Sequence, residues 1–329
     1  MAPKGKATKA PKVVYDYSGL EKDMRVQAES EGVYYAAEVV TVSTAKNRSK
    51  APVKVHFSGY GKEYDEWVDG SRLRSKALKK EAPKEKDAKK ETPKKETPKI
   101  EIKPKTIVVV CTSAAYLKGH PTGLWLEELA APYYIFKEAG YEVVIASTRG
   151  GPIPLDENSL KGDFFTAEAK KFMHDGEAFG AMAHSVRLSA IDWKSSDIKA
   201  IFMCGGHGVE IDFVRNNMLK KAIETTYAAD RVVSAVCHGP ICLAQCKKPD
   251  GSPLVKDLET TGFSNSEEDA VGLTDKCVYL IENKFKELGG VYKKADDWSP
   301  HVVVAGKLVT GQNPQSSAEC AKAVIKTLA

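Results

Sequence analysis

Long apolar runs and paired cysteine motifs are both missing from this chain. No apolar run approaches the roughly 20 residues that a membrane-spanning helix needs, so we expect no membrane segment. The basic N-terminal stretch MAPKGKATKAPK is not followed by the apolar core of a secretory signal, which predicts a protein of the cytoplasm, the nucleus or both. The seven cysteines include no CxxC pair and no Cys/His zinc-finger spacing, so we expect reduced thiols and no metal site.

Charge is distributed unevenly along the 329 residues. Residues 1–104 contain 24 Lys and Arg against 16 Asp and Glu, a net charge of +8, whereas residues 105–329 contain 25 against 28, a net charge of −3. The chain is about twice as long as a typical single domain, so we expect two modules with different partners. The basic module is the one expected to meet a polyanion such as nucleic acid.

No large apolar residue occurs in KKEAPKEKDAKKETPKKETPK (79–99), and three prolines interrupt it. Such a segment cannot bury a core, so we expect an extended, solvated linker. Its lysines fit a solvating spacer better than a specific grip on DNA. The predicted organisation is therefore a disordered basic tail at 1–14, a small domain at 15–75, a linker at 76–105 and a large domain at 106–329.

Short segments of β character fill the predicted small domain. MRVQAES (24–30), YYAAEVVTVS (34–43) and VKVHFSGY (53–60) are separated by turn residues. Segments this short and this close predict a small, curled antiparallel β-barrel. A barrel of roughly 60 residues is too small to contain a deep enzymatic pocket, so the chemistry is expected in the large domain.

In the large domain, apolar strands alternate with amphipathic helices. TIVVVC (106–111), YEVVIAS (141–147) and VVSAV (232–236) are buried-strand runs, and GLWLEELAAPYYIFKEAG (123–140) has the pattern of a helix. This alternation predicts an α/β fold with a doubly wound, mostly parallel sheet. Ligands of such folds gather at the carboxyl ends of the strands.

The segment RVVSAVCHGPICLA (231–244) places a cysteine where a strand ends. Cys237 is followed by His238 and Gly239, and Pro240 takes a position that suits the first turn of a helix. This pattern predicts a nucleophile elbow, which lifts the thiol above the sheet and aims it near a helix N-terminus that favours thiolate. The alternative interpretation is a small, buried, inert cysteine.

Several motifs together resemble a known family. AVCHGP (235–240), GGHG (205–208) and TGLWLEEL (122–129) are similar to motifs of the DJ-1/PfpI superfamily, whose sheet is glutamine-amidotransferase-like, a flavodoxin-like sandwich. TGFSNSEEDAVGL (261–273), ADDWSPH (295–301) and LVTGQNP (308–314) resemble its subfamily of glutathione-independent glyoxalases and stress chaperones. The resemblance covers nearly all of residues 106–329.

By position, the resemblance implies that Cys237 is the nucleophile, His238 its neighbour and Glu128 a helix carboxylate that hydrogen-bonds the sulfur. A carboxyl group partly buried beside a thiol is expected to have a raised pKa, to stay protonated and to act as a proton shuttle. Glu127 is the rival on the same helix, one residue away and on a different face. The spacing from the TG pair favours Glu128.

A third group is needed to orient His238 if it is to act as a base. The resemblance implies an acidic residue after the TGF motif, and Glu268 is the matching position. Glu267 and Asp269 remain alternatives. The three acids also fit a helix N-terminus, where the helix dipole stabilises negative charge without any catalytic role.

An oxyanion site is expected from Gly205 and Gly206, which follow a strand and turn backbone N–H groups inward, together with the N–H of His238. Glycine is required because a Cβ would block close approach. His207, in the same loop, is expected to line the substrate site or to support its structure rather than to act as a second base.

The resemblance implies conversion of methylglyoxal and similar 2-oxoaldehydes to 2-hydroxy acids such as lactate, without glutathione, metal or organic cofactor. A thiol adding to a small electrophilic carbonyl, with a protonated glutamate to move protons, fits this reaction. Deglycation of early glycation adducts, peptidase activity, a stress chaperone and a redox sensor that uses the same thiol are the alternatives. Members of the superfamily often form homodimers.

The small domain resembles the chromo-barrel or Tudor-knot domain through GVYYAAEVV (32–40) and VKVHFSGYGKEYDEWVDGSRLR (53–74). The resemblance implies an aromatic cage for methylated lysine, at Tyr35, Phe57, Tyr60 and Tyr64. A methylated histone tail is then the expected partner. The alternatives are that these aromatics only fill a small β core, or that the basic domain contacts nucleic acid.

Overall fold

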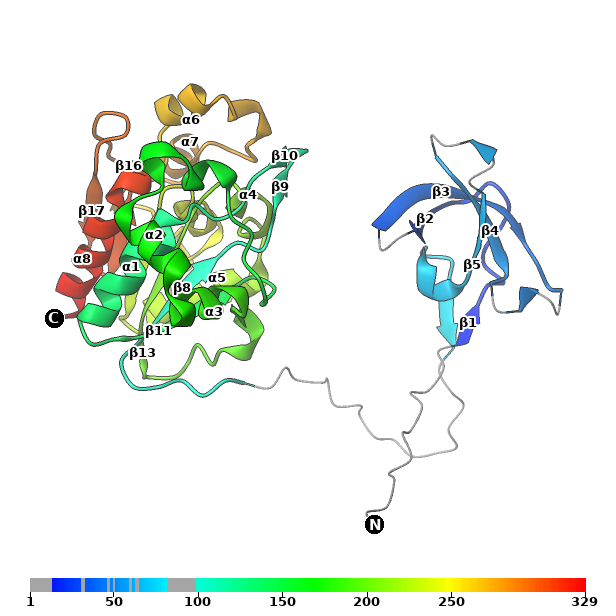
Figure 1. Ribbon diagram of the computed structural model, residues 1–329, viewed down its shortest axis with the longest axis horizontal. Coiled ribbons are helices and arrows are strands. Elements are labelled where there is room, and N and C mark those ends of the chain that lie inside the picture. Colours follow the sequence, from blue (N-terminus) through cyan, green and yellow to red (C-terminus); the bar gives the residue numbers. More distant parts are fainter. Residues whose placement is uncertain are drawn as a thin grey trace, which may run out of the picture. The chain divides into compact units, whose positions relative to one another are not determined.

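The computed structural model describes residues 14–30, 33–45, 48–49, 51–58, 61–62, 65–81 and 99–329. The chain divides into two compact units, Met1–Pro93 and Lys94–Ala329 (Figure 1). Most of the predicted basic tail and the centre of the predicted linker, residues 82–98, lie outside the described residues. No described helix is both long and apolar enough to cross a membrane.

The small unit contains a five-stranded antiparallel sheet in the order β5-β4-β3-β2-β6. Side chains alternate along β4, where Val53, Val55 and Phe57 face the core and the residues between them do not. This confirms the predicted small antiparallel β domain. The strands are β2 (Arg25–Ser30), β3 (Val33–Val42), β4 (Val53–Phe57), β5 (Glu66–Val68) and β6 (Leu73–Arg74), with a separate pair formed by β1 (Val14–Asp16) and β7 (Lys79–Glu81).

The linker predicted over residues 76–105 is wrong at both ends. At its start, Leu78 packs against the core of the small unit and β7 pairs with β1. At its end, Ile100 and Ile102 pack against the core of the large unit, and the Ile100 N–H donates to the Ala190 carbonyl oxygen at 2.8 Å. Single apolar residues among charged ones make these contacts, so the composition of the segment does not reveal them.

A seven-stranded sheet crosses the large unit in the order β12-β11-β8-β13-β14-β18-β17. All neighbouring strands are parallel except β17 and β18. The strands β8 and β14 are buried along their whole length, as expected for a sheet covered on both faces. The seven strands are β8 (Thr106–Cys111), β11 (Glu142–Ser147), β12 (Val186–Arg187), β13 (Ile198–Met203), β14 (Val232–Val236), β17 (Val302–Ala305) and β18 (Leu308–Gly311).

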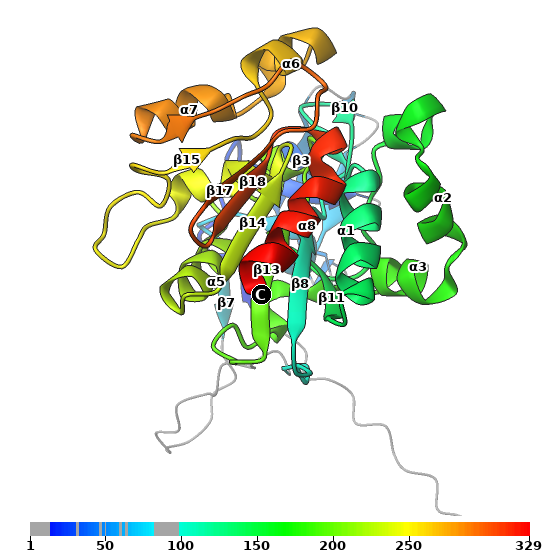
Figure 2. The same ribbon diagram turned by 90° about the vertical axis from the view of Figure 1, so that its left-hand side faces the viewer.

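Helices cover both faces of this sheet, which confirms the predicted doubly wound α/β fold (Figure 2). Helices α1 (Glu127–Glu138) and α8 (Ser317–Leu328) pack together over one face, and α5 (Asn217–Ala228) contacts β13 and β14 from the other. The other helices are α2 (Ala167–His174), α3 (Gly176–Ala183), α4 (Val209–Asp212), α6 (Asn265–Val271) and α7 (Ile281–Glu287). Two short pairs join β9 (Tyr116–Leu117) to β10 (His120–Pro121) and β15 (Glu259–Thr260) to β16 (Val291–Tyr292).

The helix predicted over residues 123–140 starts later, at Glu127. The residues before it run as a loop, because the Leu124 N–H donates to the Pro154 carbonyl oxygen at 2.8 Å instead of entering the helix.

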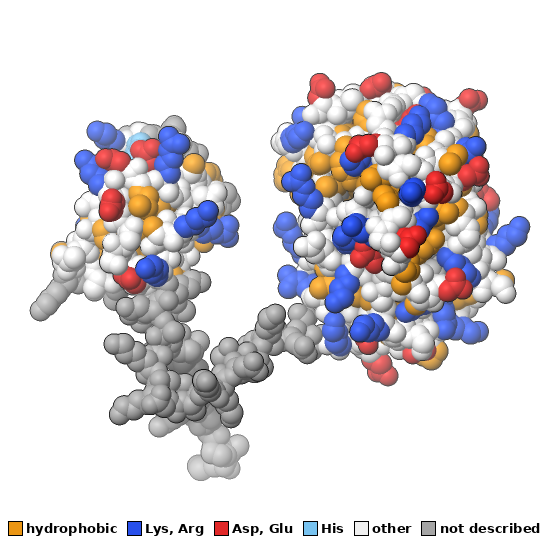
Figure 3. Space-filling model, turned by 180° about the vertical axis from the view of Figure 1, so that it is seen from behind, with side chains coloured by type: hydrophobic (Ala, Val, Ile, Leu, Met, Phe, Trp, Pro, Cys, Tyr) orange, Lys and Arg blue, Asp and Glu red, His pale blue; other side chains and the backbone are white. Residues whose placement is uncertain are grey.

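On the face of each unit that Figure 3 shows, basic and acidic side chains are interspersed rather than separated into fields of one sign. In a doubly wound fold, ligands bind at the carboxyl ends of the strands.

Candidate active site

The turn after β14 contains the predicted nucleophile. Cys237 has a φ of 60°, a left-handed conformation that is uncommon outside glycine. Its N–H donates to the Gly311 carbonyl oxygen at 3.0 Å, and its carbonyl oxygen accepts from the Phe263 N–H at 2.8 Å, so two segments hold the strained backbone. The 3₁₀ helix η7 (Gly239–Gln245) starts directly afterwards, with Pro240 in its first turn. This is the geometry of the expected elbow.

Cys237, His238 and Glu268 form a hydrogen-bonded chain. Sγ of Cys237 lies 3.3 Å from Nδ1 of His238, and Nε2 of His238 lies 2.7 Å from Oε2 of Glu268. The other oxygen of Glu268, Oε1, lies 2.8 Å from Nε2 of His207. Because a carboxylate only accepts hydrogen bonds, each histidine donates from Nε2. Nδ1 of His238 is therefore the acceptor that faces the thiol.

Electrostatics keep this chain charged at the glutamate and neutral at the histidine. Burial alone would raise the pKa of Glu268, but electrostatic attraction to His238 and hydrogen bonds from both histidines hold that pKa well below its usual range. Burial, together with the nearby His207, lowers the pKa of His238 below 6.5. A neutral imidazole oriented by a carboxylate is the arrangement a general base requires.

The three acids after the TGF motif have different surroundings. Glu267 accepts hydrogen bonds from the backbone N–H of Trp298 at 2.9 Å and from the side chain of Asn313 at 2.8 Å, and its other oxygen completes the capping box of α6. Asp269 accepts from the Thr274 hydroxyl on an exposed part of the surface. Only Glu268 reaches the histidines, so the structure places the preferred candidate at the site and both alternatives outside it.

Glu128, rather than Glu127, lies beside Cys237. It is fully buried, and its Oε2 accepts from the Gly205 N–H at 2.6 Å. Pro132 inside α1 has no N–H for the Glu128 carbonyl oxygen, which accepts instead from the Cys204 thiol at 3.0 Å. Burial raises the pKa of Glu128 to about 8, so its carboxyl group is protonated near neutral pH. Glu127 turns away and accepts a hydrogen bond from the hydroxyl of Thr166.

The Cys237 thiol differs from the low-pKa thiolate that the sequence analysis expects. Burial and the adjacent Glu128 raise its pKa well above the ordinary value. The side chain is 3% exposed, which removes the hydration that would stabilise a thiolate. In this resting arrangement the thiol is neutral, and its reactivity depends on proton transfer to His238.

The loop after β13 needs glycine at two positions. A Cβ at Gly205 would lie 2.6 Å from the backbone nitrogen of His238, and one at Gly206 would lie 2.3 Å from the Gly123 carbonyl oxygen. The Gly205 N–H was expected to face an oxyanion. In the structure it donates to Glu128 instead, so that expectation is wrong. The oxyanion roles of the Gly206 and His238 N–H groups stay predictions.

A cavity of about 290 Å³ opens beside these groups. Aromatic rings form much of its wall: Trp125 contacts Phe164 edge to face at 5.1 Å between centroids, and Phe263 lies 4.3 Å from the His238 ring and 5.8 Å from Trp298. The cavity is lined by His120, Trp125, Asp156, Asn158, Phe164, Gly206, His207, Cys237, His238, Phe263, Val271, Leu273, Trp298 and Pro314. A small, neutral carbonyl compound fits such a volume and lining.

The aromatic wall of the cavity was not predicted from the sequence. Trp125 and Trp298 belong to TGLWLEEL and ADDWSPH, two of the segments that carry the family resemblance. Trp298 also has a left-handed φ of 63°, fixed by the hydrogen bond from its N–H to Glu267. Each of these two family motifs contains a tryptophan, and this was the signal in the sequence for an aromatic wall.

Only part of the predicted aromatic cage of the small unit is described. The rings of Tyr35 and Phe57 lie edge to face at 6.1 Å. Phe57 belongs to the core of the sheet and is 6% exposed. Tyr60 and Tyr64 lie outside the described residues. The cage therefore stays a prediction.

Comparison with known proteins places both units. The model of the DJ-1/PfpI family matches residues 122–327. The Tudor-knot model, described as the RNA binding activity-knot of a chromodomain, matches residues 20–75. Glyoxalase 3 of Candida albicans is 32% identical over 64% of this chain and 91% of its own length, and the glutathione-independent glyoxalase hsp3102 of Schizosaccharomyces pombe is 31% identical over 69% and 98%.

Solved structures resemble the large unit. The Francisella tularensis Rapid Encystment Protein 24 KDa is 36% identical, with a TM-score of 0.65 over 68% of this chain and 99% of its own. Glyoxalase III from Candida albicans is 31% identical, with a TM-score of 0.63 over 68% and 96%. These likenesses cover the same region as the DJ-1/PfpI family model, which spans more than half of the sequence. The chain therefore belongs to the DJ-1/PfpI family.

Proposed function

We propose that this protein is a glutathione-independent glyoxalase that converts methylglyoxal and similar 2-oxoaldehydes to 2-hydroxy acids such as lactate. The observation that carries the proposal is the pairing of Cys237 with a buried, protonated Glu128 beside a small aromatic cavity. The names of the two curated relatives support it, since both proteins are glyoxalases.

In the proposed first step, the thiol adds to the aldehyde carbon. Nδ1 of His238, 3.3 Å from Sγ, takes the thiol proton as the carbon–sulfur bond forms. Glu128 donates its proton to the aldehyde oxygen, which becomes the hydroxyl group of a hemithioacetal. The step leaves an imidazolium at His238 and a carboxylate at Glu128, and the ionised Glu268 stabilises the imidazolium.

The proposed second step moves hydrogen between the two carbons. Glu128, now a carboxylate, removes the proton from the former aldehyde carbon while the His238 imidazolium protonates the neighbouring ketone oxygen, which gives an enediol. Glu128 then returns the proton to the second carbon, and His238 takes the proton of the first hydroxyl group. The product is a thioester of the 2-hydroxy acid, with both groups again charged.

Water completes the proposed cycle. The Glu128 carboxylate takes a proton from water while the water oxygen attacks the thioester carbon. The His238 imidazolium protonates the departing sulfur. The overall reaction adds one water to one methylglyoxal and gives lactic acid, and all three side chains return to their starting protonation states. The narrow cavity limits how much water competes for the earlier intermediates.

The alternatives are separated by one experiment on the full chain. Lactate is measured from methylglyoxal without glutathione or added metal, for wild type and Cys237→Ala. We expect turnover in wild type and background lactate in the variant, with unchanged melting temperatures. Adding N-acetyl-lysine at fixed free methylglyoxal then tests deglycation. A rate that follows the adduct rather than the free aldehyde, or no lactate from folded wild type, would contradict the glyoxalase assignment.

A redox-sensor role has less support than the glyoxalase role. Sulfenic acid forms most readily at exposed cysteines of low pKa. Cys237 is 3% exposed and burial raises its pKa, so both properties are opposite to those of a sensor. We therefore expect oxidation of this thiol by dilute peroxide to be slow compared with its reaction with methylglyoxal.

We infer that the small unit binds nucleic acid rather than a methylated histone tail. Arg25, Gln27, Arg74 and Lys76 line a hollow of about 530 Å³, and the Arg74 guanidinium stacks on Tyr34 at 3.7 Å. The expected result is binding of single-stranded RNA that weakens steeply with salt. Salt-insensitive binding of a trimethyl-lysine peptide would favour the cage instead.

A homodimer of the full chain is also expected from the family resemblance.

A further inference from the structure

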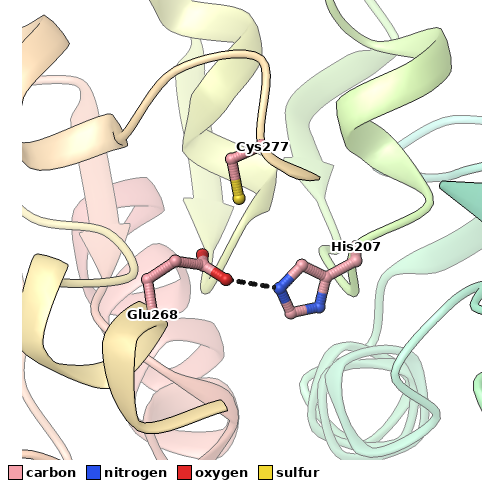
Figure 4. A group of neighbouring side chains, drawn as sticks. All are labelled: His207, Glu268 and Cys277. Atoms are coloured by element: carbon pink, nitrogen blue, oxygen red, sulfur yellow. Dashed lines mark hydrogen bonds and ion pairs between the residues drawn. The ribbon is translucent and has the colours of Figure 1, made fainter. Parts of the chain in front are cut away.

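Three side chains of metal-binding types meet next to the proposed catalytic chain. One ligand atom each from His207, Glu268 and Cys277 lies within 4.8 Å of the other two. The residues come from three segments: the loop after β13, helix α6, and the turn after the 3₁₀ helix η8 (Thr274–Lys276). Figure 4 shows the Cys277 thiol directed toward the Glu268 carboxyl group and the His207 ring.

Existing contacts position the three ligands in advance. Glu268 is held by His207 at 2.8 Å and by His238 at 2.7 Å. Sγ of Cys277 lies 3.5 Å from the Leu273 carbonyl oxygen, and the thiol also interacts with the carboxyl groups of Glu268 and Glu210. Its backbone N–H is held by the Leu273 and Thr274 carbonyl oxygens, each at 3.3 Å. An ion at this position replaces the hydrogen bond between His207 and Glu268, and the three side chains already lie close enough together to share it.

Glu210 is a second buried acid beside these three residues. Glu210 is 2% exposed, and its Oε2 accepts from the Val278 N–H at 2.7 Å. Its other oxygen, Oε1, is buried with no hydrogen-bond partner in the described structure. The charge of Glu210 acts on Cys277, and the charge of His207 acts on Glu210, so the carboxyl group lies close to both residues. A buried, unpaired carboxyl oxygen is costly, and a nearby cation would relieve that cost.

We propose that His207, Glu268 and Cys277 form an inhibitory Zn²⁺ site, with Glu210 as an adjacent carboxylate. Imidazole, carboxylate and thiolate are all zinc ligands, and the mixture of nitrogen, oxygen and sulfur disfavours Mg²⁺ and Ca²⁺. Binding releases the thiol proton of Cys277 to solvent and moves the His207 proton from Nε2 to Nδ1, and the resulting thiolate together with the Glu268 carboxylate balances the two positive charges of the ion. Cys277 is partly exposed, which gives the ion a route from solvent.

Inhibition follows from the shared carboxylate, and this part rests on the proposed glyoxalase function. Glu268 is the group that stabilises the imidazolium of His238 after it takes the thiol proton. A dication bound to the other oxygen of Glu268 withdraws that negative charge and repels the imidazolium. The base is then weaker, so occupancy of the site slows addition of Cys237 to the aldehyde.

Binding is tested first, without substrate. The metal-free full chain is titrated with Zn²⁺ by calorimetry and with Co²⁺ by the thiolate-to-cobalt absorption band, for wild type, Cys277→Ser and the control Cys237→Ser. We expect one ion per chain in wild type and in the control, and affinity lower by more than about tenfold in Cys277→Ser, without the band. Cys277→Ala replaces that variant if its melting temperature shows that it does not fold.

Three outcomes of the titrations would overturn the proposal: no binding by wild type, unchanged binding by the Cys277 variants, or loss of the ion in Cys237→Ser, which would place it at the nucleophile. The inhibition is then measured as lactate formation with and without Zn²⁺, each protein relative to its own metal-free rate. Inhibition of wild type that persists at the same Zn²⁺ concentration in Cys277→Ser would also overturn it. Because binding is read without substrate, failure of the glyoxalase assignment leaves that test intact.

Discussion

Burial sets the protonation state of the two central side chains. The Cys237 thiol and the Glu128 carboxyl group are both removed from water, and burial favours the neutral form of each. The thiol is thus activated only when His238 takes its proton, whereas Glu128 is ready to donate at once. A site with a neutral thiol and a protonated glutamate differs from one in which the cysteine is a thiolate at rest. The two kinds of site should show different pH dependences of activity.

The pH profile of kcat/KM for methylglyoxal tests this division. Activity should fall as pH rises through about 8, because Glu128 loses the proton that it must donate. On the acid side, activity should persist below pH 6.5, because the pKa of His238 is lowered and the imidazole stays neutral. Initial rates of lactate formation across this range provide the measurement. A rate that keeps rising above pH 8 would indicate thiolate formation as the limiting ionisation and contradict this account.

At the scale of elements, the site depends on two turns that pack backbone against backbone. The elbow after β14 and the glycine loop after β13 approach so closely that a Cβ at Gly205 would lie 2.6 Å from the His238 nitrogen and 2.7 Å from the Gly239 nitrogen. The Gly205 N–H also fixes the Glu128 carboxyl group. Gly205 thus helps to position the nucleophile Cys237, the base His238 and the acid Glu128.

Gly205→Ala should therefore destabilise the fold and impair the site together. We expect a loss of about 1–3 kcal/mol in the free energy of unfolding, typical of overpacking, and a large drop in kcat. The matched control is Gly180→Ala in α3, where a Cβ has nothing within 4 Å and alanine favours the helix. Urea unfolding and lactate formation are measured for both. If Gly205→Ala were as stable as Gly180→Ala, the elbow after β14 and the loop after β13 could move apart without cost, which would contradict this account.

The sequence predicts these elements better than it predicts their surroundings. The strand before Cys237 and the proline after it are local patterns, so the elbow follows from them. The choice of Glu268 over its neighbours agrees with the motif match, but the second partner of Glu268, His207, is 61 positions distant and no periodicity indicates it. Burial of Cys237 depends on packing from several segments, so the sequence does not indicate that burial raises the pKa of its thiol.

At the scale of the whole molecule, the two units have separate cores, so the large unit should work alone. Residues 99–329 should retain the melting temperature of the large unit and its kcat/KM for methylglyoxal. Residues 106–329, cut at the predicted boundary, lack Ile100 and Ile102 and should lose about 1–3 kcal/mol. Calorimetry and lactate assays of both fragments provide the comparison. If the longer fragment were inactive although folded, the small unit would contribute to the site.

The most direct measurement of the central claim compares two adjacent glutamates. Glu128→Gln removes the proposed proton donor while retaining an oxygen for the Gly205 N–H, and Glu127→Gln changes a neighbour that contacts Thr166 instead. We expect kcat for lactate formation to fall by about 10²–10⁴ in the first variant and to change only a few-fold in the second. Near wild-type turnover in Glu128→Gln, or equal losses in both variants, would contradict Glu128 as the proton shuttle.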